Sequence, residues 1–431
     1  MRSQQKLVVI DGLRTPFLRA GTGFAGTPAD ELGRMALVAL LAKTGLDPAR
    51  IDEVILGCVG QPPDTANIAR VIALRAGVPA SVPAVTVNRN CASGFESITT
   101  AWDRVQSGRG EVFVVGGVES MSSYPLLYGP RSTRAFTRLA RAKSLGQKIA
   151  ALLSIPPSDL LRPRSALKLG LTDPVSGLNM GETAELIGRE AGITRAQADA
   201  FAAASHRRAL AARDFLGDEI APAYVGPDFS APILADNGPR PDATEEKLAT
   251  LRPSFERGTG RVTAGNASQV SDGAVMLLVM SEAKAAELGY HHPLGVLGPF
   301  TYAACDPSRM GLGPVFAFHK LEKAGAPAAA SADLVEINEA FATQVLACQA
   351  RMGDAAWCAE HLGRSGAMGA IPAERLNVNG GAIALGHPVG ASGARLVLTA
   401  LRELRRRGGR RALISTCVGG GQGAAGWLFR E

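Results

Sequence analysis

The chain of 431 residues contains one α/β pattern twice, and this repeat limits its fold more than any other feature. Residues 41–57 (LAKTGLDPARIDEVILG) and 321–337 (LEKAGAPAAASADLVEI) both run from a helix end through glycine and aspartate into an apolar strand. Residues 87–117 and 378–420 form a second pair, in the same order. Each starts at Val-Asn, turns through Ala-Ser-Gly into an amphipathic helix, and ends in an apolar strand with Gly-Gly. Two matches in one order indicate a duplicated α/β unit.

The repeat predicts two similar halves around a region of different composition. Helices alternating with short β-rich runs predict an α/β fold with mostly parallel sheets covered by helices. We place the first half at residues 1–120, completed by a strand and helix at 261–284, and the second half at 285–431. The region between them, 121–260, is rich in Pro and Arg. Related turns of the two halves should meet near a pseudo-two-fold axis.

Composition limits the environment and the partners. The six cysteines are scattered without a CxxC pair, so we expect neither a disulfide framework nor a metal site, and a reducing cytoplasm is the default. No stretch reaches the roughly 18 uncharged apolar residues of a membrane-spanning helix. The net charge of +7 favours anionic partners, and a phosphorylated small molecule, an acidic protein, an anionic membrane and nucleic acid all fit charge alone.

Residues 131–170 form the most basic segment of the chain. They hold nine Lys or Arg residues against one acid, Asp159, with apolar residues at near-helical spacing. A solvated cationic face explains this pattern without any partner. An anionic ligand, a membrane surface or a partner subunit explains it equally well.

The first candidate for chemistry is Cys91, in TVNRNCASGFES. A lone cysteine is commonly a small buried apolar residue. Here the following Ala-Ser-Gly permits a tight turn into an amphipathic helix, which puts the thiol at a helix N-terminus. The helix dipole and free N–H groups at that end favour the thiolate. The sequence therefore predicts a nucleophile at Cys91.

His387, in NVNGGAIALGHPVGASGAR, lies on the turn that the repeat matches to the Cys91 turn. A single histidine is usually structural, but two related turns that converge would bring an imidazole to a thiol. That pairing is the one a cysteine nucleophile needs.

Two further candidates lie at predicted strand ends. Cys417 is followed by three glycines, whose N–H groups can serve a developing oxyanion, and a second thiol there would suit acid–base work. The simpler interpretation is a buried strand-end cysteine. Asn338, in EINEAFATQ, is either a helix N-cap or an amide that orients substrate or water.

Taken together, these motifs resemble the thiolase family. The matching segments fall in family order over essentially the whole chain: RTPF, NRNCASGFES, MGETAE, TAGNAS, SDGA, GLGPVFA, NEAFA, NVNGGAIALGHPVGASGAR and CVGGGQGAA. The resemblance implies a duplicated, five-layered α/β/α/β/α core with a loop domain inserted in its first half. It also implies reversible conversion of 3-ketoacyl-CoA and CoA into acetyl-CoA and a shortened acyl-CoA.

The resemblance assigns roles by position. It makes Cys91 the nucleophile, His387 its activator and a donor to the thioester oxygen, and Cys417 the acid–base that serves the acetyl-CoA carbanion and the incoming CoA. Asn338 would hold an ordered water in one oxyanion hole, and the N–H groups of Cys91 and Gly419 would form the other. The remaining implied contacts are with pantetheine for Met180 and Ser268 and with the acyl group for Phe341.

Several functional alternatives accompany this prediction. The long insert resembles β-subunits of fatty-acid oxidation complexes, so degradative 3-ketoacyl-CoA thiolase is favoured over biosynthetic acetoacetyl-CoA thiolase. A decarboxylating ketoacyl synthase fits less well, since His387 is the only well-placed histidine of the six. A non-catalytic acyl-CoA-binding scaffold fits less well, since every catalytic position of a thiolase is filled. The resemblance implies CoA as co-substrate with no permanently bound cofactor, a homodimer or homotetramer, and a hydratase/dehydrogenase α-subunit or a membrane as partner of residues 131–170. We expect no nucleic-acid partner.

Overall fold

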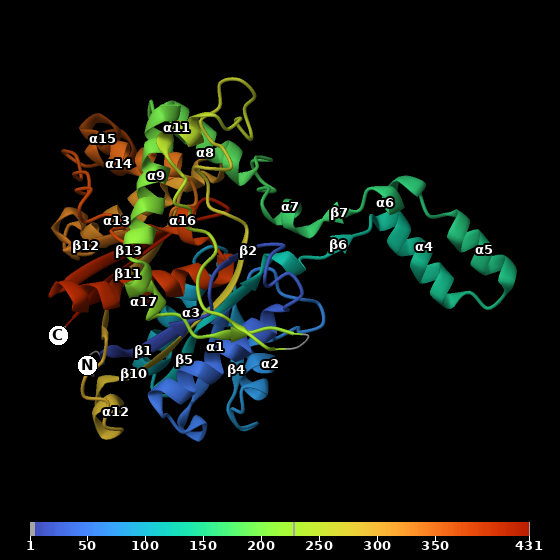
Figure 1. The fold of residues 1–431 in the computed structure, drawn as a ribbon, viewed down its shortest axis with the longest axis horizontal. Helices are drawn as coiled ribbons and strands as arrows, with labels where there is room; N and C mark the ends of the chain where they lie inside the picture. The colour runs from blue at the N-terminus through green and yellow to red at the C-terminus, as the bar shows by residue number, and fades with distance from the viewer. Residues whose placement is uncertain (1–4, 227–228, 431) are drawn as a thin grey trace.

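The computed structural model describes residues 5–226 and 229–430 and is organised around one mixed, ten-stranded sheet (Figure 1). The strand order is β12-β13-β14-β11-β1-β10-β5-β3-β4, with β2 paired to β10. The strands are β1 (Leu7–Arg14), β2 (Leu18–Arg19), β3 (Glu53–Gly57), β4 (Ala84–Val87), β5 (Val112–Ser120), β10 (Ser271–Ser281), β11 (Gly295–Ala304), β12 (Leu334–Ile337), β13 (Arg411–Val418) and β14 (Gln422–Phe429).

The repeat in the sequence appears as two strand sets with the same order. The first set runs β3-β5-β10-β1 and the second runs β12-β13-β14-β11. The sets join where Val8 pairs with Val296 and Val9 with Gly295. The predicted returning strand is β10, which lies between β1 and β5.

The expectation of mostly parallel sheets is wrong. Only β3–β4, β3–β5 and β12–β13 are parallel among the described strand pairs, and the remaining pairs are antiparallel. The reason lies in the connections. A parallel pair needs a crossover segment, whereas β13 reaches β14 through the short turn at Gly419–Gly421 and must reverse direction.

Helices cover both strand sets and fill the space between them, which gives the five layers. Helices α1 (Ala29–Thr44) and α2 (Ile68–Arg75) pack on the outer face of the first set. Helices α13 (Gly313–Lys323) and α14 (Ala342–Gly353) pack on the outer face of the second. A third apolar cluster surrounds α3 (Ser93–Gln106) and α17 (Val389–Arg407), which form the middle layer.

The central helices α3 and α17 touch through glycines of the two Ala-Ser-Gly turns. A Cβ on Gly94 would lie 2.8 Å from the backbone nitrogen of Ala394, and a Cβ on Gly393 would lie 2.6 Å from that of Phe95. Neither position leaves room for a larger residue, because the obstructing atoms are backbone. The two related turns therefore meet in the middle layer. Cys91 lies just before α3 and His387 just before α17, so this contact also brings the two candidate residues to the same region.

The region between the halves has two parts. Its second part packs against the core and contains α8 (Met180–Glu190), α9 (Arg195–Ala211), α10 (Arg213–Gly217), β8 (Ala223–Tyr224), β9 (Pro232–Ile233) and α11 (Glu245–Ala249).

In the part of the chain that the structure describes, three further α-helices belong to the core: α12 (Glu282–Glu287), α15 (Ala355–Leu362) and α16 (Ala382–Leu385). No helix in the described ranges is long and apolar enough to cross a membrane.

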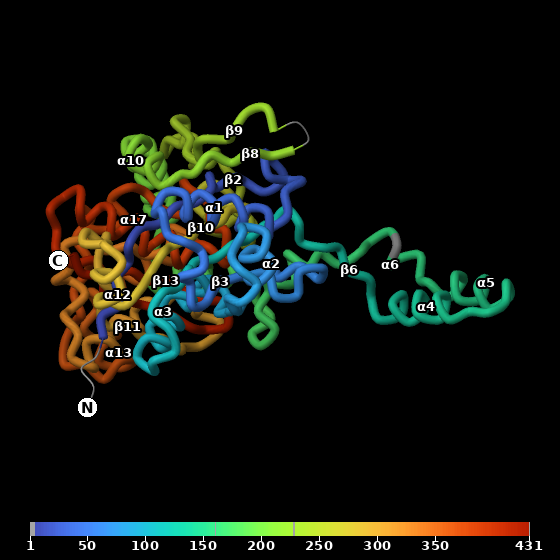
Figure 2. The backbone as a smooth tube through the Cα atoms, turned by 90° about the horizontal axis from the view of Figure 1, so that it is seen from below, coloured from blue at the N-terminus to red at the C-terminus, as the bar shows by residue number. Residues whose placement is uncertain are grey.

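The first part of this region is an arm that extends away from the body in both views (Figures 1 and 2). Its base is the two-stranded ribbon of β6 (Leu126–Leu127) and β7 (Arg164–Ser165), followed by α7 (Ala166–Gly170). Beyond the ribbon lie α4 (Pro130–Arg141), α5 (Leu145–Leu153) and α6 (Pro157–Leu161). The predicted basic segment is thus a projecting helical arm.

Candidate active site

One cavity of about 690 Å³ gathers most of the residues singled out from the sequence. Its lining includes Cys91, His387, Cys417, Gly419, Met180, Ser268 and Phe341. The eighth predicted residue, Asn338, is fully buried and meets the site through His387, with its amide nitrogen 3.4 Å from Nε2. Residues from both halves and from the inserted region therefore surround one space.

Cys91 lies on the turn between β4 and α3, just before the helix begins at Ser93. Asn90 takes a positive φ of 44° and donates to the carbonyl of Gly419 at 2.9 Å, which ties this turn to the second half. The backbone N–H groups of Gly419 and of Cys91 itself lie near the sulfur and lower the pKa of the thiol. These are the two donors predicted for an oxyanion hole.

Two opposing effects decide the protonation state of Cys91: nearby backbone N–H groups favour the thiolate, and burial favours the thiol. Burial raises the pKa of the thiol to about 11, although the two backbone N–H groups lower it. Burial has the larger effect because the sulfur is enclosed and no Lys or Arg lines the cavity in the described part of the chain. Cys91 is therefore protonated in the free protein and needs a base to remove its proton when it reacts.

His387 is held by its turn and by α17. Its backbone N–H donates to Oγ of Ser271 at 3.2 Å, and its Nδ1 lies 2.6 Å from Oγ of Ser392. Burial, with a smaller effect from the charge of Arg395, lowers the pKa of the imidazole to about 4. The ring is therefore neutral near pH 7 and able to accept a proton.

Asn338 follows β12, which ends at Ile337. The N-cap interpretation of Asn338 is wrong, since α14 begins only after Phe341 as its N-cap residue. The backbone N–H of Asn338 instead donates to the carbonyl of Ser415 at 2.9 Å, which holds the side chain beside His387. Its Oδ1 is buried and has no hydrogen-bond partner in the described part of the chain.

Cys417 is the last residue but one of β13 and also lines the cavity. It is fully buried and packs with Met310, Ala340, Met180 and Phe341. Burial, followed by the nearby Cys91, raises the pKa of this thiol well above its ordinary value. The free protein therefore presents Cys417 as a protonated thiol, which can act as a proton donor.

The structure adds Glu119, which the sequence interpretation missed. This carboxylate at the end of β5 accepts the backbone N–H groups of Val59, Gly60 and Gly390 at 3.1, 2.9 and 2.9 Å, and the hydroxyl of Tyr124 at 3.0 Å. These hydrogen bonds connect the turn at Val59 and Gly60, in the first half, to the turn that follows His387 in the second half. An acid inside the buried strand run VFVVGGVES was the available signal.

The cavity wall away from the thiols is largely apolar, and the base of the arm contributes part of it. The apolar lining includes Met121, Pro125, Leu127, Ala166, Leu167, Leu171, Pro174 and Val175. No Lys or Arg is among the described residues that line the cavity, so cations expected near an anionic ligand lie outside it. Lys168 is one such cation, exposed on α7 beside Leu167.

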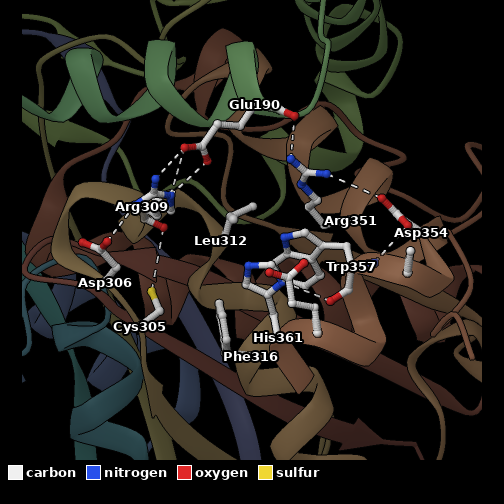
Figure 3. A pocket seen from close by; sticks show the side chains of 12 residues that line it. Glu190, Cys305, Asp306, Arg309, Leu312, Phe316, Arg351, Asp354, Trp357 and His361 are labelled. Atoms are coloured by element: carbon white, nitrogen blue, oxygen red, sulfur yellow. Dashed lines mark hydrogen bonds and ion pairs between the residues drawn. The ribbon is translucent and has the colours of Figure 1, made fainter. Parts of the chain in front are cut away.

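A second cavity, of about 630 Å³, lies beyond the end of α8 (Figure 3). Its charged groups are already paired, Arg309 with Glu190 and Asp306, and Arg351 with Asp354 at 3.6 Å. Its aromatic wall includes Trp357, which stacks on His361. Cys305 is the thiol there, and burial raises its pKa to about 12. The described residues that line this cavity include no base–nucleophile pair comparable to the first.

Family models match nearly the whole chain. The thiolase N-terminal domain matches residues 7–283 and the thiolase C-terminal domain matches residues 291–430. The 3-ketoacyl-CoA thiolase of Pectobacterium atrosepticum is 39% identical over 428 residues, which cover 98% of this chain and 96% of the relative. That of Yersinia enterocolitica is also 39% identical, with 98% and 97% covered.

Solved structures give the same result. The Bacillus anthracis acetyl-CoA acetyltransferase superimposes with a TM-score of 0.85 at 36% identity and covers 100% of both chains. The human mitochondrial 3-ketoacyl-CoA thiolase in complex with CoA gives 0.83 at 35% identity, with 99% of this chain and 98% of the other covered.

Proposed function

Since the chain belongs to the thiolase family, we propose that it cleaves 3-ketoacyl-CoA with CoA into acetyl-CoA and a shortened acyl-CoA. The observation that carries the proposal is the single cavity lined by Cys91, His387 and Cys417, because Claisen cleavage needs a nucleophile, its base and a separate acid. The curated relatives named above are 3-ketoacyl-CoA thiolases, which supports a role in fatty-acid β-oxidation.

In the first half-reaction, the Cys91 sulfur attacks the ketone carbon of the substrate and its proton passes to His387. The bond to the acetyl unit then breaks, and the acetyl-CoA carbanion takes the proton of Cys417. The acyl group stays on Cys91 as a thioester. The N–H groups of Cys91 and Gly419 serve the oxygen on the ketone carbon. His387 and a water held by the Asn338 amide serve the thioester oxygen of the departing acetyl-CoA.

The second half-reaction reverses these proton transfers. The Cys417 thiolate takes the proton of incoming CoA, whose sulfur attacks the acyl-Cys91 thioester. Cys91 leaves and recovers its proton from His387. The raised pKa of Cys417 supports this step, because its thiolate is a stronger base than an ordinary thiol. The result is a shortened acyl-CoA and the free protein.

CoA is a co-substrate in this scheme, and the proposal includes no permanently bound cofactor. Met180 and Ser268 line the cavity where pantetheine would enter, and Phe341 lines it beside Cys417. The phosphates of CoA would stay outside, near exposed cations such as Lys168. The division into a first half (1–120 with 261–284), a loop domain (121–260) and a second half (285–431) belongs to the same proposal, and the pairing of β10 with β1 and β5 supports it.

The second candidate is an acetoacetyl-CoA thiolase, favoured by the likeness to the acetyl-CoA acetyltransferase structure. The apolar wall at the base of the arm argues for a longer acyl chain. The acyl part of a four-carbon substrate is too short to offer apolar contacts to side chains such as Leu127, Leu167 and Leu171.

Thiolysis across 3-ketoacyl-CoA lengths from C4 to C16 tests the choice. We expect kcat/KM to rise at least about tenfold from C4 to C8, since each buried methylene contributes about 0.8 kcal/mol. Leu167→Ser should remove most of that rise while leaving C4 turnover within about twofold. A wild-type preference for C4 would instead favour the biosynthetic enzyme, and no turnover at any length would overturn thiolysis.

The partners of the protein are also proposals, and the arm is the structural support for one of them. Leu145, Ile149, Leu152 and Leu153 on α5 are 49–82% exposed, at the i, i+4, i+7, i+8 spacing of one helix face. The only acid of residues 131–170, Asp159, is bonded to Ser132 at 2.6 Å, so the cations dominate the surface of the arm. We propose contact with an anionic membrane surface.

Co-sedimentation with vesicles tests this contact. The wild-type protein should bind vesicles with 30% phosphatidylglycerol but not neutral phosphatidylcholine vesicles, and 0.5 M salt should weaken the binding. Ile149→Ser with Leu153→Ser should reduce binding at least about fivefold, whereas the control Leu74→Ser, exposed on α2, should not.

Light scattering should find the same homodimer or homotetramer in all variants. Equal sedimentation of every variant would contradict the proposed membrane contact. Binding of a hydratase/dehydrogenase subunit through the same residues would show that the arm contacts a partner subunit instead. A cytoplasmic location stays a prediction from the sequence.

A further inference from the structure

The two ring nitrogens of His387 have different surroundings. Nδ1 lies 2.6 Å from Oγ of Ser392, which α17 carries at its fourth position. Nε2 faces the Asn338 amide at 3.4 Å and is the nitrogen left for the cavity that holds Cys91. Ser392 is 2% exposed, so its contact with Nδ1 is shielded from water.

The hydroxyl proton of Ser392 determines which nitrogen carries the imidazole proton. Oγ donates this one proton to the carbonyl of Pro388 at 2.9 Å, one helical turn back. The same oxygen can then only accept from His387, which places the imidazole proton on Nδ1. Nε2 is left with its lone pair, in agreement with the N–H that Asn338 directs at it.

We propose that Ser392 is a positioning residue that holds His387 in the tautomer whose Nε2 takes the proton of Cys91. This inference rests on the proposed function, because it explains how the base of that reaction is kept ready. After the transfer, Nδ1–H still donates to Ser392, and the new Nε2–H points toward the cavity. The hydroxyl therefore serves both the neutral ring and the cation.

Loss of the hydroxyl would leave Nδ1–H buried without an acceptor, which favours the other tautomer or a turned ring. The charged and titratable groups around this turn are Cys91, Cys417 and Tyr124 in the cavity, Glu119 behind Gly390, and Arg395 on α17. Ser392 carries no charge, so its removal changes the proton position without changing the charges of these groups. A catalytic histidine in the wrong tautomer is known to cost up to about 10⁴-fold.

The test compares Ser392→Ala, Ser392→Thr and the control Thr399→Ala. Thr399 lies two turns further along the same helix, is equally buried, and its hydroxyl bonds to Glu219 at 3.1 Å, outside the cavity. Three quantities are measured: thiolysis kcat and KM, the single-turnover rate of Cys91 acylation by intact mass, and the rate of Cys91 alkylation by iodoacetamide from pH 6 to 10. Thermal unfolding of each variant reports its stability.

We expect Ser392→Ala to lower kcat and the acylation rate about 10²–10³-fold with KM within about threefold, and to slow alkylation near pH 7. Ser392→Thr, which keeps the hydroxyl, should recover most of the loss, and Thr399→Ala should lose stability but not kcat. A Ser392→Ala variant with wild-type acylation and alkylation would overturn the inference. A wild-type protein without thiolysis would overturn the proposed function instead, and the alkylation rates would still report on Ser392.

Discussion

Replacing Cys91 with serine should abolish the acyl-enzyme and lower thiolysis by about 10⁴-fold or more. The reason is the base. The neutral His387, whose pKa is lowered to about 4, can take a proton from a thiol during attack far more readily than from a hydroxyl, which is a much weaker acid. Intact mass spectrometry after mixing with a 3-ketoacyl-CoA should show the added acyl group on the wild type and none on Cys91→Ser.

The matched control is Cys305→Ser, which removes another partly exposed thiol, in the second cavity. It should keep the acyl-enzyme and thiolysis within about threefold of wild type. An unchanged acyl adduct in Cys91→Ser would contradict the role of the nucleophile. Tight acyl-CoA binding without any turnover in the wild type would point to the non-catalytic scaffold, and malonyl-dependent condensation without thiolysis would point to the decarboxylating synthase.

Much of this site was predictable because the repeat carries spatial information. Two copies of one unit predict equivalent positions for the Cys91 and His387 turns, and the contact of Gly94 with Ala394 and of Gly393 with Phe95 brings those turns together. The order β3-β5-β10-β1 against β12-β13-β14-β11 repeats the same relation in the sheet. A pattern that is local in sequence thus predicted a contact between residues about 300 positions apart.

The features that could not be predicted from the sequence depend on the burial of side chains and on the direction in which strands pair. The helix N-terminus favours the thiolate of Cys91, but burial of the sulfur has the larger effect on its pKa and is visible only in the assembled cavity. Glu119 was missed because its N–H partners, Val59, Gly60 and Gly390, lie about 60 and 270 positions away from it in the chain. The parallel strand pairs were overestimated because periodicity gives the type of an element and not the direction in which it returns.

Replacing Cys417 with alanine should separate the two halves of the chemistry. The variant keeps Cys91, His387 and the oxyanion donors, so it should still accept an acyl group from a donor that needs no carbanion, such as an activated thioester. Thiolysis of 3-ketoacyl-CoA should fall about 10²–10⁴-fold, since no thiol remains to protonate the departing acetyl-CoA carbanion or to deprotonate CoA.

Exchange of the acetyl-CoA α-protons with deuterated water isolates the step that Cys417 would perform. The wild type should exchange them, Cys417→Ala should not, and Cys348→Ala, which removes another fully buried thiol, should exchange them at close to the wild-type rate after allowance for its stability. Exchange at the wild-type rate in Cys417→Ala would assign the acid–base role to another group. Loss of acylation as well would mean that the substitution collapses the wall formed with Met310 and Phe341 rather than removing a proton carrier.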